Sequence, residues 1–166
     1  MIRITSLLLA ASVAAAAQDA AIRNFLRVNE TFCTGGQPTA EQLEKLKADG
    51  VRAIINLRQP SEHDAAAEEA RAKDLGLRYV NLPVLGSDPK DSQVEEFLRI
   101  TDDPQNRPAF IHCGSANRVG AFWMIRRVLR DKWSVQDAQA EALKIGMQQG
   151  GSVHAFALRY IEQAKK

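Results

Sequence analysis

Apolar and polar residues alternate in blocks along this chain, and the blocks show two different periods. Three short runs rich in β-branched and apolar residues are typical of strands buried on both faces. These runs lie at Val51–Leu57, Leu77–Val84 and Arg107–Cys113. A shorter run within Thr31–Thr39 leads into a Gly-Gly-Gln-Pro turn, so a further strand is predicted ahead of them.

Between these runs the pattern changes to the spacing of amphipathic helices. Helices are predicted over residues 40–50, 61–76 and 92–100. The first of them carries Leu43 and Leu46 on one face and ends at a glycine. Strands that alternate with helices across short loops predict βαβ units. We therefore expect an α/β fold with a central, mostly parallel sheet flanked by helices.

From Asn117 onward the pattern is helical throughout, and we expect this C-terminal half to pack on the sheet within the same domain. Its helices are predicted over residues 118–133, 135–148 and 153–166. The first of these helices must bury most of its surface. Its expected core residues are Phe122, Trp123, Ile125 and Val128, whereas Arg126 and Arg127 are expected to face solvent.

Composition agrees with one globular domain, because 45% of the 166 residues are apolar and 25% are charged. The net charge of +2 gives no indication of nucleic-acid binding. Residues 1–17 have a basic start, an apolar run and small residues at the end, the pattern of a signal peptide. We therefore expect cleavage after Ala17 and a single exported domain over residues 18–166. If the source is Gram-negative, the expected location is the periplasm, with no stable membrane insertion after cleavage.

Cysteine and histidine are scarce, which limits the chemistry available to the chain. Cys33 and Cys113 could form a disulfide in an oxidising compartment, but a domain of this size does not require one, and we expect free thiols. Cys33 is expected to be a core thiol, or else a redox partner that shields Cys113. Three histidines without paired spacing predict neither a metal site nor a cofactor.

The candidate site lies where the last predicted strand ends. Cys113 occupies that position, and four residues separate it from Arg118: Gly114, Ser115, Ala116 and Asn117. Small residues let backbone N–H groups converge, and a helix N-terminus adds a positive end, so this loop can bind a tetrahedral anion. The same field and the nearby arginine favour a cysteine thiolate. The Arg118 fork matches phosphate or sulfate oxygens.

The stretch "IHCGSANRVG" resembles the signature loop of the cysteine-dependent protein tyrosine and dual-specificity phosphatases. With "GGQPT", "GVRAIINLRQPSE" and "GLRYVNLPV", the chain resembles the beta-lactamase hydrolase-like phosphatase-like domain family, also described as sulfur transferases, over about residues 31–129. The resemblance implies a protein tyrosine phosphatase-like fold. It also implies Cys113 as the nucleophile, Arg118 as the oxyanion clamp and residues 114–117 as the cradle. His112 would orient the loop, and Arg58 and Glu62 would line the rim.

The chain departs from the phosphatase pattern at three points. Four residues, not five, lie between the cysteine and the arginine, and Val119 replaces the usual serine or threonine after the arginine. A general acid normally follows the preceding strand. The expected slot falls near Gly86, and Asp88 is the preferred candidate, although a solvated loop carboxylate explains it equally well. Asp91 is explained as a helix N-cap.

These residues support three functional hypotheses. The first is hydrolysis of phosphomonoesters, such as a phosphotyrosine, a phosphoprotein or a small phosphate ester, through a phosphocysteine on Cys113. The second is sulfur transfer through a persulfide on the same residue. The third is an anion-binding module without turnover, which Val119 and the ambiguous acid would permit. All three imply a phosphorylated or sulfur-containing anionic substrate or ligand.

Overall fold

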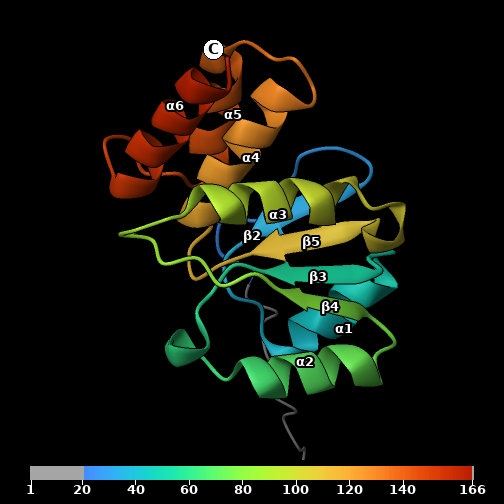
Figure 1. Ribbon diagram of the computed structural model, residues 1–166. Coiled ribbons are helices and arrows are strands. Elements are labelled where there is room, and N and C mark those ends of the chain that lie inside the picture. The colour runs from blue at the N-terminus through green and yellow to red at the C-terminus, as the bar shows by residue number, and fades with distance from the viewer. Residues whose placement is uncertain (1–20, 166) are drawn as a thin grey trace, which may run out of the picture.

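A computed structural model describes residues 21–165, so the signal peptide predicted over residues 1–17 lies outside the described residues and stays a prediction. Five strands form one sheet in the order β1-β2-β5-β3-β4 (Figure 1). They are β1 (Leu26–Arg27), β2 (Phe32–Gly35), β3 (Ala53–Asn56), β4 (Arg78–Asn81) and β5 (Ala109–His112). Every pairing is parallel except that of β1 with β2, which confirms the predicted α/β class.

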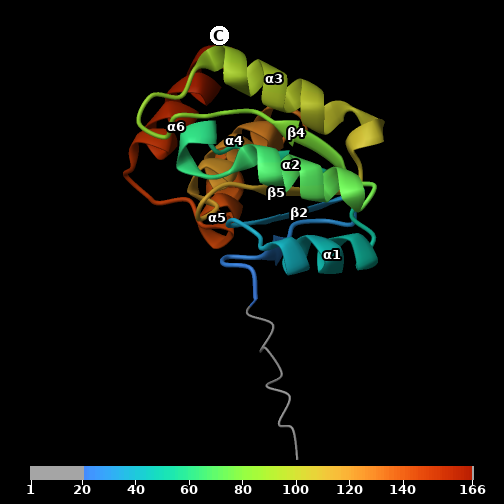
Figure 2. The same cartoon turned by 90° about the horizontal axis from the view of Figure 1, so that it is seen from below.

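Helices cover both faces of the sheet (Figures 1 and 2). They are α1 (Ala40–Ala48), α2 (Ala65–Asp74), α3 (Asp91–Asp102), α4 (Asn117–Leu129), α5 (Val135–Ile145) and α6 (Ser152–Ala164), with short 3-10 turns η1 (Pro60–Glu62) and η2 (Pro104–Asn106). Helices α1 and α2 lie on one face, and α3 to α6 lie on the other. Helix α4 of the predicted helical C-terminal half packs on the sheet through Trp123 against Phe32, and α5 and α6 pack on α4.

Alternation along the central strands supplies both cores. Ile54 and Phe110 pack with Leu43 and Leu46 of α1, while Ile55 packs into the larger core beneath the C-terminal helices. Successive strand residues point to opposite faces, so a continuous apolar run is what a doubly covered strand requires. The predicted inward face of α1 is confirmed.

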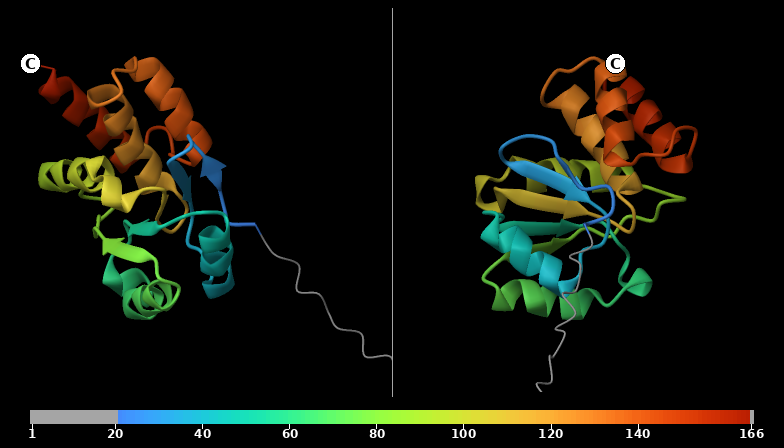
Figure 3. Two further views of the ribbon diagram at one scale, coloured as in Figure 1. Left: turned by 90° about the vertical axis from the view of Figure 1, so that its right-hand side faces the viewer. Right: turned by 180° about the vertical axis from the view of Figure 1, so that it is seen from behind.

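Some element boundaries differ from the predictions. Helix α2 begins at Ala65, since Asp64 accepts the Ala67 N–H as its cap and residues 60–62 form a 3-10 turn. Asp91 is not the N-cap of α3: Lys90 holds that position, and Asp91 pairs with Arg159 at 2.8 Å. Strand β1, at the sheet edge beside the C-terminal helices, was not predicted because two residues carry no periodic pattern (Figure 3).

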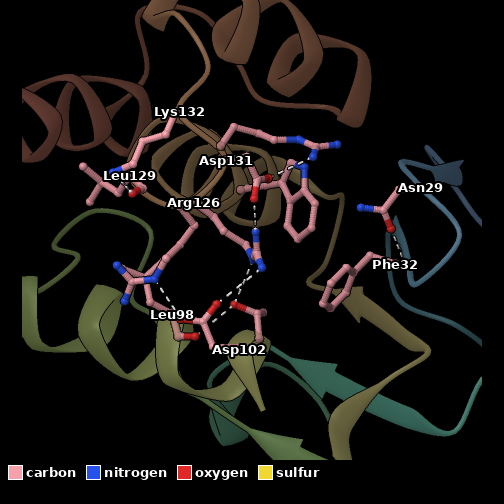
Figure 4. Close-up of polar contacts among 12 residues, drawn as sticks. Asn29, Phe32, Leu98, Asp102, Arg126, Leu129, Asp131 and Lys132 are labelled. Carbon is pink, nitrogen blue, oxygen red and sulfur yellow. Dashed lines mark hydrogen bonds and ion pairs between the residues drawn. The ribbon is translucent and has the colours of Figure 1, made fainter. Parts of the chain in front are cut away.

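The prediction that Arg126 and Arg127 face solvent is wrong, because each residue is 7% exposed. The Arg126 guanidinium lies 5.5 Å from the centre of the Phe32 ring and pairs with Asp131 at 2.9 Å (Figure 4). Arg127 stacks on aromatic rings in a similar way and pairs with Glu141 at 2.6 Å. Aromatic faces and paired carboxylates compensate the burial of both charges.

Within residues 21–165, no helix combines the length and the apolar character needed to cross a bilayer.

Candidate active site

Cys113 directly follows β5, the strand at the centre of the sheet between β2 and β3. The chain then passes through residues 114–116 and enters α4 at Asn117. Ligands of open α/β sheets bind at this carboxyl edge, where loops lead into helix N-termini. The sheet therefore places the sulfur and the start of α4 at the expected binding edge.

The loop holds an unusual backbone conformation at Ala116, the N-cap of α4, where φ is +67°. A residue with a Cβ adopts this left-handed region at a cost of about 1–2 kcal/mol. Contacts from outside the loop hold it in shape: Asn24 donates to the Ser115 carbonyl at 2.9 Å, and the Gln37 N–H donates to the Gly114 carbonyl at 3.4 Å. The Gly114 carbonyl thus faces outward, so the Ser115 N–H across the same trans peptide faces inward.

Asn117 is the first residue of α4, and its side chain binds outside the loop. Its side-chain oxygen accepts the Gln148 N–H at 2.8 Å, which ties the start of α4 to the segment between α5 and α6. The side chain is therefore occupied as an anchor. The first N–H groups of α4 have no partner within the helix, as at every helix start, and they remain the donors for an anion.

Arg118 is clamped so that one edge of its guanidinium remains available. Nη1 donates to Glu62 Oε1 at 2.6 Å and to the Val84 carbonyl at 2.8 Å, and Nη2 donates to Glu62 Oε2 at 2.7 Å. A guanidinium has five N–H bonds. These contacts use three of them and leave one on Nε and one on Nη2, the adjacent pair that binds an oxyanion in bidentate fashion.

The charges at this site reinforce each other. The Arg118 guanidinium, which donates to both carboxylate oxygens, lowers the pKa of Glu62 to about 2. Burial acts to lower the pKa of Arg118, but the bonds to Glu62 and the nearby Cys113 sulfur outweigh it and raise that pKa. Arg118 thus faces both the carboxylate that fixes it and the Cys113 sulfur.

Replacing Glu62 by Gln is expected to lower kcat/KM by about tenfold or more, because an amide cannot hold both ends of the Arg118 fork. The pKa of the Glu62 carboxyl is lower in the folded chain than its ordinary value of 4.5. The ion pair with Arg118 therefore stabilises the fold above this ordinary pKa, and the stabilisation is lost as the pH falls toward 2. The difference in melting temperature between the wild type and Glu62→Gln should therefore shrink below about pH 4. Glu96→Gln, which removes an exposed pair with Arg99, is the control; an equal loss of activity there would contradict the assignment.

Arg58 lies beside the same loop. Its Nη1 donates to Gln37 Oε1 at 2.8 Å, its Nη2 donates to the Glu62 carbonyl, and its Nε is 3.6 Å from Glu62 Oε2. A Cβ built on Gly114 would lie within 4.0 Å of both Arg58 and Arg118. The structure therefore brings Arg58, Glu62, Arg118 and Gly114 together.

The Asp88 carboxylate binds outside this cluster. It pairs with Lys90 and is 61% exposed, and it makes no hydrogen bond or ion pair with the loop of residues 113–118. Gly86 faces Arg118 instead, since a Cβ built there would lie 3.8 Å from Arg118 Cδ. The Gly86 carbonyl accepts the Ser152 hydroxyl at 2.7 Å, which ties this segment to α6. A glycine thus occupies the position beside Arg118 where a general acid was expected.

His112 is fully buried, stacked on Phe110 with ring centres 5.6 Å apart. Its Nε2 lies 2.8 Å from Glu68 Oε1 on α2, although the two groups are not aligned as a hydrogen bond. Sequence reasoning did not identify Glu68. The available signal was its spacing of four residues from Ala72, which puts a glutamate on the inner face of an alanine-rich helix.

Cys33 takes no part in this site. It is buried on β2, where it pairs with Phe110 of β5. Phe110 lies three residues before Cys113, so Cys33 and Cys113 are about 10 Å apart along the strands. A disulfide requires Cα atoms within about 7 Å. Both thiols are free, and burial raises the pKa of Cys33 to about 11, as expected for a core thiol and not for a redox partner.

Residues 21–165 contain no cluster of three or more histidine, cysteine or carboxylate side chains that could hold a metal ion.

The chain is similar in sequence and in structure to known proteins. A beta-lactamase hydrolase-like protein of Xylella fastidiosa (strain Temecula1 / ATCC 700964) is 26% identical over 130 residues, which are 76% of this chain and 30% of that protein. The crystal structure of a DUF442 protein from Shewanella putrefaciens CN-32 is similar with a TM-score of 0.72 and 23% identity, covering 87% of this chain and 91% of that chain. The core catalytic domain of the PP-IP phosphatase SIW14 from S. cerevisiae, in complex with citrate, gives a TM-score of 0.71 at 21% identity, covering 85% of each chain.

The chain spans about a third of the length of the beta-lactamase hydrolase-like proteins that it matches. The structural neighbours share the fold, which confirms the protein tyrosine phosphatase-like architecture expected from the signature loop. The model of one family, described as DSP-PTPase phosphatase fused to NAD+ Kinase, matches residues 11–157. The chain therefore belongs to this family of cysteine-based phosphatases.

Proposed function

We propose that the chain hydrolyses phosphomonoesters through a phosphocysteine on Cys113. The observation that carries the proposal is the nearness of the Cys113 sulfur to the Arg118 guanidinium, which Glu62 and Val84 hold in place. Two parallel N–H donors and the N-terminus of α4 form one oxyanion site next to a nucleophile. This combination suits an anionic, phosphorylated substrate.

The reaction would proceed in two displacements. The Cys113 thiolate attacks phosphorus, a sulfur–phosphorus bond forms, and the bond from phosphorus to the ester oxygen breaks. The leaving oxygen departs with the electron pair of that bond and takes a proton from solvent. Water then attacks the phosphocysteine, which releases inorganic phosphate and restores the thiolate. Arg118 and the loop N–H groups bind the phosphoryl oxygens in both steps.

The position beside Arg118 holds Gly86, and the carboxylate of Asp88, in the same loop, pairs with Lys90. Glu62 cannot serve as the acid, because Arg118 lowers its pKa to about 2. With neither of these carboxylates available as a proton donor, departure of the leaving group depends on its own stability as an anion. We therefore propose aryl phosphates, the class that includes phosphotyrosine, as better substrates than alkyl phosphates.

The leaving group provides a direct test of this preference. Turnover is expected to fall steeply as the pKa of the leaving phenol or alcohol rises, and Asp88→Asn is expected to change it by less than about twofold throughout, because the carboxylate is directed at Lys90. The measurement is kcat/KM for a series of substituted phenyl and alkyl phosphates. A loss in Asp88→Asn confined to poor leaving groups would instead assign Asp88 as the general acid.

Hydrolysis itself is tested with purified protein and p-nitrophenyl phosphate, with tungstate as a competitive oxyanion. The proposal predicts turnover that tungstate inhibits. If the protein instead transfers sulfur from thiosulfate and shows no hydrolysis, the site serves a persulfide on Cys113. Tungstate binding without either activity would make it an anion-binding module.

A further inference from the structure

A buried polar cluster lies directly behind the catalytic loop, and Glu68 is at its centre. The Glu68 side chain is 6% exposed and projects from α2 toward the sheet. Its carboxylate meets polar groups from separate segments of the chain. They are His112 Nε2 at 2.8 Å, His63 Nε2 at 3.1 Å, Gln37 Nε2 at 3.1 Å and Asn56 Nδ2 at 3.4 Å.

Two of these contacts lead to the active site. His112 directly precedes Cys113 in the chain. Gln37 contacts the loop through its backbone N–H, which donates to the Gly114 carbonyl at 3.4 Å, and its Oε1 accepts at 2.8 Å from Arg58, which lies beside the loop. One carboxylate thus holds the residue before the nucleophile and the residue that contacts the start of the loop.

The charge of Glu68 makes this arrangement stiff. Burial acts to raise the pKa of Glu68, but the His112 and His63 imidazoles and the Gln37 amide outweigh it, so the pKa lies below its ordinary value. The carboxylate therefore stays ionised in a poorly hydrated place. Moving any partner away would leave a buried charge less well compensated, which is strongly unfavourable. The cluster accordingly resists displacement of His112 and Gln37.

We propose that Glu68 is a positioning residue for the reaction at Cys113, acting through His112 and Gln37 and touching no substrate. The inference rests on the proposed function for its kinetic consequence. The carboxylate fixes the end of β5 and the Gln37 turn relative to each other, and these two points hold the sulfur and the Gly114 peptide that begins the loop. A shift of about 1 Å in such a site costs up to about 100-fold in rate.

The test compares Glu68→Gln with Glu69→Gln, its neighbour on α2, which is exposed and pairs with Lys73. Glu68→Gln keeps the shape of the side chain and removes the charge. We expect kcat for p-nitrophenyl phosphate to fall by about tenfold or more with KM changed less than about threefold, and Glu69→Gln to stay within about twofold of the wild type. The number of active sites is measured as the amount of Cys113 alkylation that tungstate prevents. Because kcat is then expressed per active site, unfolded protein is not mistaken for a slower enzyme.

A double-mutant cycle separates positioning from a general loss of structure. If Glu68 acts largely through His112, then Glu68→Gln should reduce kcat per active site much less in a His112→Gln background than in the wild type. Additive losses would overturn the proposal, and so would an unchanged kcat in Glu68→Gln. If Glu68→Gln does not fold, Gln37→Leu provides the test, because it leaves the Glu68 carboxylate in place. This variant should lower kcat by about threefold or more, and an unchanged kcat would overturn the proposal.

The outcome for Glu68 stays distinct from that for the proposed function. Should the wild type lack phosphatase activity, the proposed function fails. The rate of Cys113 alkylation still reports the loop. Under the proposal, Glu68→Gln changes this rate by about tenfold while Glu69→Gln leaves it unchanged; equal rates in both variants would overturn it.

Discussion

Replacing Cys113 by Ser is expected to lower kcat for p-nitrophenyl phosphate by about 10⁴-fold or more, the scale on which removal of a nucleophile acts. A serine hydroxyl stays protonated at neutral pH, and the Glu62 carboxylate is bound to Arg118. The oxyanion site itself is made by Arg118 and backbone N–H groups, so tungstate should still bind the variant. Steady-state kinetics and calorimetry measure the two properties.

Cys33→Ala is the matched control for this substitution. Cys33 is a buried thiol on β2 whose sulfur contacts the Ala109 carbonyl at 3.6 Å, remote from the loop. Its removal should cost some stability and leave kcat within about twofold. Substantial turnover in Cys113→Ser, or a large loss of kcat in folded Cys33→Ala, would contradict the assignment of the nucleophile.

Replacing Arg118 by Lys is expected to lower kcat/KM by about 10²- to 10³-fold, the range seen when a donor to a developing oxyanion is lost. The lysine ammonium retains the positive charge. It cannot donate two parallel hydrogen bonds to Glu62 and two more to a phosphoryl group. The affinity for tungstate should fall with the activity, because the same N–H pair binds both. Titration of tungstate against the rate of p-nitrophenyl phosphate hydrolysis measures this.

Arg159→Lys is the control, since Arg159 also pairs with a carboxylate, Asp91, at 2.8 Å but lies outside the site. It should retain wild-type kinetics within about twofold. If Arg118→Lys behaved like Arg159→Lys, charge alone would suffice at position 118. The geometric account of the guanidinium edge would then be wrong.

Much of the fold could be predicted from the sequence because its signals are local. Runs such as Val51–Leu57 are apolar over the whole length of a short strand, which indicates burial on both faces. The inward pair Leu43 and Leu46 follows from helical spacing. The position of Cys113 at the end of a central strand follows from the same pattern, because parallel strands all end at one edge.

The remaining features depend on partners that are distant in sequence. The burial of Arg126 was not predictable from α4 alone, because the Phe32 ring that it faces comes from β2. The clamp on Arg118 depends on Glu62, which is 56 residues away. The direction of Asp88 depends on its pairing with Lys90, which an exposed loop permits without any periodic signal. Tertiary contacts of this kind decide orientation, and local sequence patterns decide only position.

The contacts around Glu68 show the same limit. The sequence places this glutamate on the inner face of α2, yet its four polar partners come from separate segments of the chain. A carboxylate on the buried face of an alanine-rich helix indicates such a polar cluster, because buried charges are nearly always paired. Its connection to the catalytic loop becomes visible only when β5 and the Gln37 turn are brought together.

Mass spectrometry of the Cys113 peptide tests the central claim most directly. The protein is mixed with p-nitrophenyl phosphate, stopped rapidly in acid, and digested. A phosphoryl group on Cys113, absent from Arg118→Lys or much reduced in it, is the result expected of a thiolate that shares one oxyanion site with this arginine. A peptide that never carries phosphate during turnover, or that gains sulfur from thiosulfate alone, would contradict it.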